Sequence, residues 1–150
     1  VAGTITAHHL VLTLDDLIGD KAKPHNFCKP IAKRPEDREA LIKAATSGNP
    51  KFFFGSDSAP HCRFNKEMGQ GAAGVFSAPV AMPLLAQIFE ERGALDKLED
   101  FTSKFGANYY GLSLNSEQLV LEKEDWQVPY NYSEIVPFMA GETLKWRVKR

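Results

Sequence analysis

The sequence lacks several features that would narrow its function at once. Its only cysteines, Cys28 and Cys62, make neither a disulfide framework nor a zinc-knuckle spacing. No apolar run approaches the ~20 residues of a membrane span. The formal net charge of -1 gives no strong field to attract nucleic acid or an anionic membrane. These absences predict a globular protein of a reducing, cytoplasmic compartment, with no nucleic-acid or membrane partner.

Nucleotide-binding signatures and processing signals are missing as well. The glycines between Gly69 and Gly74 lack the spacing and the preceding strand of a dinucleotide fingerprint, and no Lys-Ser/Thr pair completes a P-loop. Such small residues form either a flexible loop or a place where the backbone approaches another group closely. The chain starts with VAGTIT, without an initiator Met or a signal-peptide pattern, as expected of a chain entered in the middle of a fold.

The first third of the chain has the pattern of a β-α-β unit. Residues 4–6 are β-formers, and the apolar run Phe52–Phe54 is typical of a short buried strand. Between them, Pro35 followed by two acids opens a helix, which the breakers at 47–50 end. This order predicts two parallel strands joined by a crossover helix.

The segment before that helix is long and irregular. Residues 15–30 contain several breakers, and such a loop inside a compact domain is usually functional or disordered. Lys29 precedes a proline and should be extended, which leaves its backbone N–H free, while its ammonium group is expected in solvent. His8 and His9 follow the first strand; on a strand they would point to opposite faces, so we expect local hydrogen bonds rather than one shared metal.

The second half of the chain is predicted to be more helical. Residues 79–92 carry apolar side chains at helical spacing, which indicates a core-facing helix rather than a partner-binding face. A second helix is expected over 96–105, closed by Gly106, and then a turn with buried aromatics over 108–112. Residues 144–150 alternate apolar and basic side chains and predict a half-exposed strand with a solvated basic face.

The stretch KFFFGSDSAPH at residues 51–61 carries the candidate site. Asp57 lies where the predicted strand gives way to a loop, and His61 follows four residues later. Asp57 is either an ordinary turn or cap residue or a functional carboxylate, because ligands of parallel α/β folds bind outside the carboxyl ends of the strands. A single carboxylate does not hold a zinc ion, so a metal site here needs further ligands.

Several segments, taken in order, resemble dihydroorotases of the bacterial and fungal type in the amidohydrolase superfamily. They are TITAHHL at 4–10, FCKPIAKR at 27–34, GSDSAPH at 55–61, GAAGVFSAP at 71–79, NYYGL at 108–112 and IVPFMAGETLKWRVKR at 135–150. The resemblance implies an α/β fold, the C-terminal part of a (β/α)8 TIM barrel. Residues 1–150 would supply the last two barrel strands, the C-terminal helices and the tail of a metal-dependent amidohydrolase domain. That piece is incomplete on its own, because a closed barrel needs ~250 residues.

The same resemblance implies an activity and roles for individual residues. The family interconverts N-carbamoyl-L-aspartate and L-dihydroorotate in pyrimidine biosynthesis, with two zinc ions in each active site. Asp57 matches a zinc ligand that also works as general acid and base, and His61 matches the histidine that contacts the substrate carboxylate. Lys29 and Ala73 match substrate-binding positions that act largely through the main chain. The family suggests a homodimer.

The remaining ligands of that family match no residue here. They are a His-x-His pair, a carboxylated lysine and two further histidines, and we expect them in a missing N-terminal part of the barrel. The isolated 150 residues are therefore expected to be inactive. Two alternatives stay open: a catalytically silent fragment or interaction module without a metal centre, and another cyclic amidohydrolase such as a hydantoinase.

Overall fold

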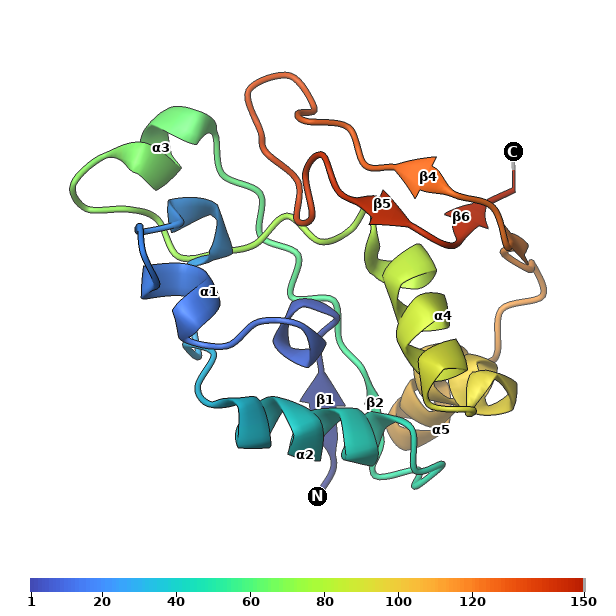
Figure 1. Cartoon of the computed structure of the whole chain (residues 1–150). Coiled ribbons are helices and arrows are strands. Elements are labelled where there is room, and N and C mark those ends of the chain that lie inside the picture. The colour runs from blue at the N-terminus through green and yellow to red at the C-terminus, as the bar shows by residue number, and fades with distance from the viewer. Residues whose placement is uncertain (150) are drawn as a thin grey trace.

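The computed structural model describes residues 1–149, and its N-terminal third is the predicted β-α-β unit (Figure 1). Strand β1 (Gly3–Ile5) pairs in parallel with β2 (Phe52–Phe54), with Thr4 opposite Phe53. Helix α2 (Pro35–Ala45) forms the crossover and packs against β2. The predicted parallel arrangement of these strands is confirmed.

Local interactions explain where α2 begins and ends. Pro35 occupies its first turn, and the carboxylate of Asp37 accepts a hydrogen bond of 3.1 Å from the backbone N–H of Arg34. After Thr46 the chain turns at Gly48, whose φ of 77° favours glycine. Between α2 and β1 the chain forms only short helices, which are η1 (His8–Leu10), α1 (Asp15–Ile18) and η2 (Pro24–Asn26).

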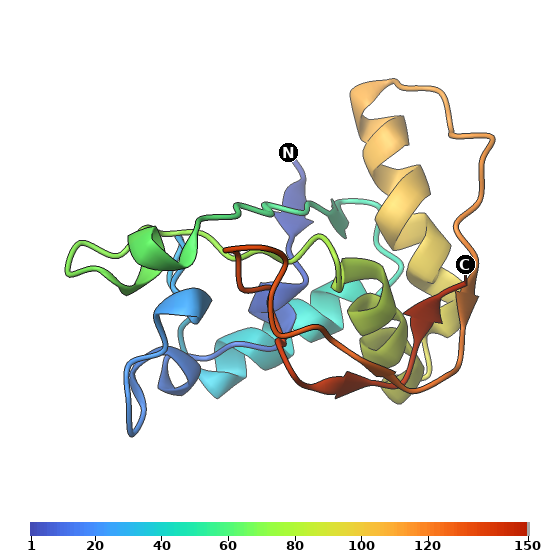
Figure 2. The same ribbon diagram turned by 90° about the horizontal axis from the view of Figure 1, so that it is seen from above.

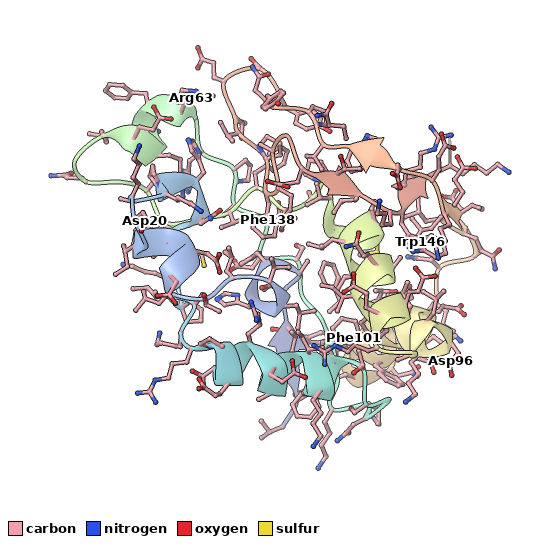
Figure 3. All side chains as sticks on the ribbon, in the orientation of Figure 1. Asp20, Arg63, Asp96, Phe101, Phe138 and Trp146 are labelled. Atoms are coloured by element: carbon pink, nitrogen blue, oxygen red, sulfur yellow. The ribbon has the colours of Figure 1, made fainter. Side chains whose placement is uncertain are left out.

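Helix α4 (Ala81–Glu91) is the most buried helix and supplies the centre of the core. Its predicted apolar stripe is buried, with Leu85 and Phe89 at 0% exposure. The ring of Phe89 lies 5.3 Å from that of Phe101 on the next helical segment, which packs against β2. Figure 3 places Phe101 and Phe138 in the interior and the charged Asp20, Arg63 and Asp96 at the rim. The core-facing assignment of the helix is confirmed.

The helix after α4 is longer than predicted and does not end at Gly106. It runs through η3 (Leu95–Lys97), a π-helical turn η4 (Asp100–Lys104) and α5 (Phe105–Tyr110), and it stands beside α4 in Figure 2. A Cβ on Gly106 would lie 3.2 Å from the Phe53 ring, so this glycine allows close packing instead of stopping the helix. Gly111, with a φ of 67°, is the residue that ends it.

The predicted turn with buried aromatics over 108–112 is therefore wrong. Tyr109 and Tyr110 belong to α5, and their exposed fractions are 52% and 62%. Their rings contact Phe53 from the outside, at centroid distances of 5.4 and 5.9 Å. The sequence pattern was misleading because an aromatic pair at the end of a helix can cover a core residue without being buried itself.

The C-terminal tail is a pair of short antiparallel ladders, and the single strand predicted over 144–150 is only partly correct. Strand β4 (Trp126–Gln127) pairs with β5 (Thr143–Leu144), and β3 (Leu121–Glu122) pairs with β6 (Arg147–Val148). Both ladders lie next to α4 (Figure 1). Leu144 is buried, whereas the alternating basic residues face outward or form surface ion pairs such as Arg147–Glu122.

Neither a closed barrel nor a membrane span is found within residues 1–149. The strands form separate two-stranded sheets, of which only β1–β2 is parallel. The structure is thus of mixed α/β type. In the described part of the chain no helix has both the length and the hydrophobicity needed to cross a bilayer.

Candidate active site

Asp57 lies in a cleft at the carboxyl ends of the two parallel strands. The cleft has a volume of about 510 Å³ and is lined by Thr4, Ile5, Thr6, His9, Pro30, Leu41, Gly55 and Asp57. Strand β2 can pass β1 here only because residue 55 is glycine: a Cβ would come within 2.8 Å of the Cβ of Thr4. Small molecules bind at this end of parallel sheets, so the cleft stands where a site is expected.

The Asp57 carboxylate is exposed and free. Its backbone has a φ of 39°, a left-handed conformation that aspartate tolerates better than most residues. Within residues 1–149, no hydrogen bond or ion pair engages its side chain. The following residues are held firmly: the Ala59 N–H donates to the Val75 carbonyl at 3.0 Å. A rigid backbone thus presents an uncompensated carboxylate to the cleft, which suits a metal ligand or proton acceptor.

His9 lines the same cleft and ties its two sides together. Its Nδ1 lies 2.7 Å from the hydroxyl oxygen of Thr6, and its Nε2 lies 2.7 Å from the carbonyl oxygen of Pro30. Since a carbonyl only accepts hydrogen bonds, Nε2 carries the proton and Nδ1 accepts from Thr6. The expectation of local hydrogen bonds is met for His9, and the bond to Pro30 adds a long-range link.

The expectation that His8 and His9 point to opposite faces is wrong. These residues lie on η1 and not on a strand, so their ring centroids are only 4.7 Å apart. With Cys28 they bring three potential ligand atoms within 4.8 Å of one another. His9 already uses both ring nitrogens, however, and burial above all raises the pKa of the Cys28 thiol. The trio in this state is not a ready metal site.

His8 is the one histidine of this group that has no polar contact. It is fully buried, and neither ring nitrogen has a hydrogen-bond partner among the described residues. Burial above all, and the neighbouring His9 to a smaller extent, lower the pKa of His8 to about 4. The imidazole is therefore neutral at physiological pH.

The other predicted substrate-binding residues lie beside this cleft and do not line it. His61 Nε2 is 3.2 Å from the carbonyl oxygen of Ala73, so these two residues are brought together. The glycine at 74 is needed here, because a Cβ would meet Ala59 at 2.7 Å. The Gly74 N–H in turn donates to the Phe27 carbonyl at 2.8 Å, which connects this loop to the one that carries Lys29.

The solvent exposure predicted for the Lys29 side chain is confirmed. Its side chain is exposed, while the following Pro30 lines the cleft with Asp57. Two loops therefore reach the site, residues 27–30 and 72–74. No pattern in the sequence indicates that Lys66 lies between these loops. Its exposed fraction is only 3%, and its ammonium group contacts both loops.

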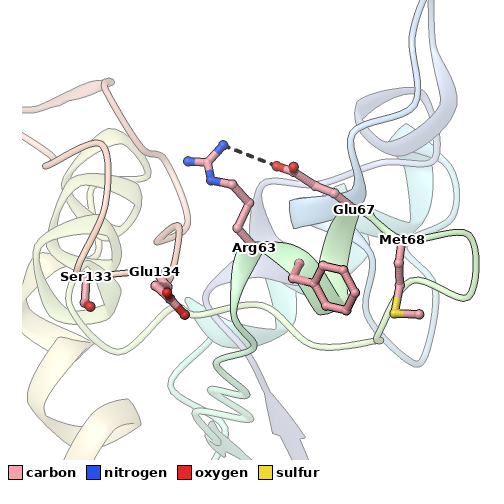
Figure 4. Close-up of a pocket in the computed structure, with 6 residues that line it drawn as sticks. Arg63, Glu67, Met68, Ser133 and Glu134 are labelled. Carbon is pink, nitrogen blue, oxygen red and sulfur yellow. Dashed lines mark hydrogen bonds and ion pairs between the residues drawn. The ribbon is translucent and has the colours of Figure 1, made fainter.

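A second hollow, of about 650 Å³, lies on the outer side of the short helix α3 (Arg63–Glu67). Figure 4 shows Arg63 and Glu67 joined by an ion pair of 3.2 Å, with Ser133 and Glu134 on the facing loop. The pair is exposed, and its contribution to stability is small for that reason. None of the predicted site residues lines this hollow.

Comparison with known proteins finds dihydroorotases that are similar to this chain over almost all of its length. A dihydroorotase of Coxiella burnetii is 50% identical over 99% of this chain, and the mitochondrial dihydroorotase of Arabidopsis thaliana is 50% identical over 98% of it. Over this span the chain is a relative of the dihydroorotases. The matches cover 44% and 40% of those two proteins, so the chain spans less than half of their length. No known protein-family profile matches the sequence.

Solved structures agree with the dihydroorotase assignment. A dihydroorotase from Saccharomyces cerevisiae, solved in complex with 5-fluoroorotic acid, superposes with a TM-score of 0.91 at 47% identity, over 99% of this chain and 43% of that one. A D-hydantoinase from a Thermus species superposes with a TM-score of 0.75 at 14% identity, over 95% and 36%. The second match shows a shared fold and nothing more. The predicted dihydroorotase resemblance is thus confirmed, and the hydantoinase alternative gains no support.

Proposed function

We propose that residues 1–150 are the C-terminal part of a longer zinc-dependent dihydroorotase, one portion of a (β/α)8 amidohydrolase domain. The single observation that carries the proposal is the free carboxylate of Asp57 in a cleft at the carboxyl ends of two parallel strands, in a chain half identical to dihydroorotases. The whole protein would interconvert N-carbamoyl-L-aspartate and L-dihydroorotate in the cytoplasm and form a homodimer.

The residues present fit one ligand of a zinc site and not the whole site. Asp57 offers an unengaged carboxylate, whereas His9, the other ligand-type side chain in the cleft, uses both ring nitrogens. The remaining ligands must come from the part of the barrel that lies outside these residues. When bound, Zn²⁺ polarises the amide carbonyl and lowers the pKa of water.

Asp57 is the residue that would move the proton during ring opening. Its carboxylate takes a proton from the attacking water as the new C–O bond forms, and the ring C–N bond breaks. The same carboxyl group then returns the proton to the leaving nitrogen, so Asp57 ends the reaction in its starting protonation state.

His61 and the backbone of Lys29 and Ala73 would bind the substrate. Dihydroorotate carries a carboxylate outside the ring, and an imidazole N–H or a backbone N–H is a suitable donor for it. His61 already contacts the Ala73 carbonyl, so the two predicted binding positions lie side by side. Hydantoin lacks this carboxylate, so a comparison of the two substrates distinguishes a dihydroorotase from a hydantoinase.

The test compares substrates in the full-length protein and in His61→Ala. We expect ring opening of dihydroorotate, followed by its ultraviolet absorbance, and no turnover of hydantoin. His61→Ala should raise the KM for dihydroorotate about tenfold or more, as expected for the loss of a charge-assisted hydrogen bond. Turnover of hydantoin with none of dihydroorotate would overturn the proposal, and an unchanged KM in His61→Ala would remove its binding role.

A catalytically silent piece is the competing interpretation for the isolated chain. Because the zinc ligands other than Asp57 are proposed to lie elsewhere, the 150 residues alone should neither hold stoichiometric zinc nor open dihydroorotate. Turnover by the purified fragment would show that these residues contain a complete centre.

A further inference from the structure

Lys66 is a buried cation whose hydrogen bonds within residues 1–149 all go to backbone carbonyl oxygens. Its Nζ donates hydrogen bonds to the carbonyls of Phe27 at 2.9 Å, Ala72 at 2.9 Å and Gly74 at 2.6 Å. The ammonium group also lies 5.9 Å from the centroid of the Phe27 ring. Only the ammonium form of lysine has one N–H for each of these acceptors.

Keeping this charge inside the protein costs free energy. Lys66 forms no ion pair with any of the carboxylates in residues 1–149, and burial lowers its pKa to about 8. The group is still protonated at neutral pH, so the three carbonyls must offset its lost hydration. An apolar side chain of similar length would avoid the free-energy cost of burying a charge. The charge is thus better explained by what it holds in place than by stability alone.

The three carbonyls belong to the two loops that reach the site. Phe27 lies two residues before Lys29, and Ala72 and Gly74 stand on either side of Ala73. The loops also bond directly, since the Gly74 N–H donates to the Phe27 carbonyl at 2.8 Å. Lys66 therefore sits at the junction of the loops.

Peptide geometry connects the lysine to the groups that would meet the substrate. In a planar trans peptide the C=O and the following N–H point in opposite directions. Because the Ala72 carbonyl points at Lys66, the N–H of Ala73 points away from it. Within the described residues, the N–H groups of Lys29 and Ala73 make no hydrogen bond to the backbone. They are thus free for a ligand.

We propose that Lys66 is a positioning residue for substrate binding. Its ammonium group holds the loops 27–30 and 72–74 together, so that the backbone N–H groups of Lys29 and Ala73 meet the carboxylated substrate. This inference rests on the proposed function. It goes beyond it by assigning the arrangement of the two binding loops to one side chain that does not itself touch the substrate.

The test uses the full-length protein with Lys66→Met, and with Lys33→Met as the matched control. Lys33 also donates to a carbonyl, that of Ile31 at 2.6 Å, but it is exposed and the contact is local. In Lys66→Met we expect the Gly74 amide to exchange its hydrogen about tenfold faster or more, and the KM for dihydroorotate to rise by a similar factor. The kcat should change much less, because the reacting groups stay in place.

A purely structural role would give a different pattern. It would lower the fraction of folded protein, and with it the apparent kcat, and leave the KM unchanged. Lys66→Arg provides a second variant: it keeps the charge but spreads its donors over a plane, so smaller changes in the same direction are expected. Wild-type KM and Gly74 exchange in Lys66→Met would overturn the proposal. If Lys66→Met does not fold, a KM that rises in Lys66→Arg while Gly74 exchange keeps its wild-type rate would overturn it as well.

Failure of the inference and failure of the proposed function are distinguishable. A full-length wild-type protein that does not open dihydroorotate contradicts the function, while Gly74 exchange still reports whether Lys66 holds the loops. Conversely, an active wild-type protein whose KM is the same in Lys66→Met and Lys33→Met contradicts the role of Lys66 alone.

Discussion

Asp57 and Lys66 stand on neighbouring parts of the same site and are treated in opposite ways by the fold. The carboxylate of Asp57 is exposed, has a left-handed backbone and has no partner within residues 1–149. The ammonium group of Lys66 is buried and donates to three carbonyls. The Asp57 carboxylate is thus free to react, whereas the Lys66 ammonium group uses its hydrogen bonds to hold other residues in position.

The largest effect is expected on turnover when the reactive group, Asp57, is replaced. Asp57→Asn keeps the shape of the side chain and removes its basicity, so dihydroorotate turnover by the full-length protein should fall by about 10³-fold. Stability to urea should hardly change, because the side chain is exposed and asparagine tolerates the same backbone conformation. Asp20→Asn, at another exposed acid, is the control. Equal kcat values in Asp57→Asn and the wild type would contradict the assignment.

The next effect concerns His8, a buried group without the hydrogen bonds that Lys66 has. Its pKa is lowered to about 4 in the fold, against ~6.5 when unfolded. Between these values the unfolded chain binds a proton that the folded chain does not. Stability should therefore rise with pH across this window and be lost on acidification, by about 3 kcal/mol in all.

His8→Leu, which cannot titrate, should remove this part of the acid sensitivity. Urea unfolding of both proteins at pH 7 and pH 4.5 measures it, because the carboxylates titrate equally in both and cancel in the comparison. If the two proteins lose the same free energy of unfolding between these pH values, His8 is not buried as a neutral imidazole.

The free energy of unfolding of Lys66→Met tests how much the Lys66 hydrogen bonds stabilise the fold. Removing the donor leaves three carbonyls without their partner, although it also relieves the burial of a charge. We expect a net loss of about 2 kcal/mol in the free energy of unfolding. Urea unfolding should show almost no loss in Lys33→Met, since that contact is exposed. A Lys66→Met protein as stable as the control would mean that relief of the buried charge fully offsets the loss of the three bonds.

The smallest effect is expected at Lys29, where only the backbone is proposed to act. Its side chain is exposed and its N–H does not depend on the side chain. Lys29→Leu should change the KM for dihydroorotate by less than about twofold. A large rise in KM would show that the Lys29 ammonium group itself takes part in substrate binding.

The sequence predicts the elements whose signals are local. The strand Phe52–Phe54, the helix opening at Pro35 and the apolar stripe of α4 all follow from spacing and caps, and the structure contains them. The prediction for Gly106 is wrong because a glycine that admits the Phe53 ring looks the same in sequence as one that ends a helix. That distinction depends on a residue some fifty positions away and no local pattern records it.

The candidate site shows the same division. Asp57 could be found because a carboxylate after a buried strand is unusual, and the matched motifs supplied its proposed role. The pairing of His8 with His9 was missed because a 3₁₀ turn replaced the expected strand. Lys66 was missed for a deeper reason. Its partners are backbone carbonyls, which every residue has, so no side-chain pattern in the sequence marks a lysine that joins two loops.

Zinc binding by the full-length protein shows whether Asp57 completes a metal site whose other ligands lie outside residues 1–150. Equilibrium dialysis against Zn²⁺ would compare the wild type, Asp57→Asn and the control Asp20→Asn. We predict that, of the two variants, only Asp57→Asn weakens zinc binding, at one site or more and by about tenfold or more, with the fold intact. Identical zinc affinity and stoichiometry in all three proteins would contradict it.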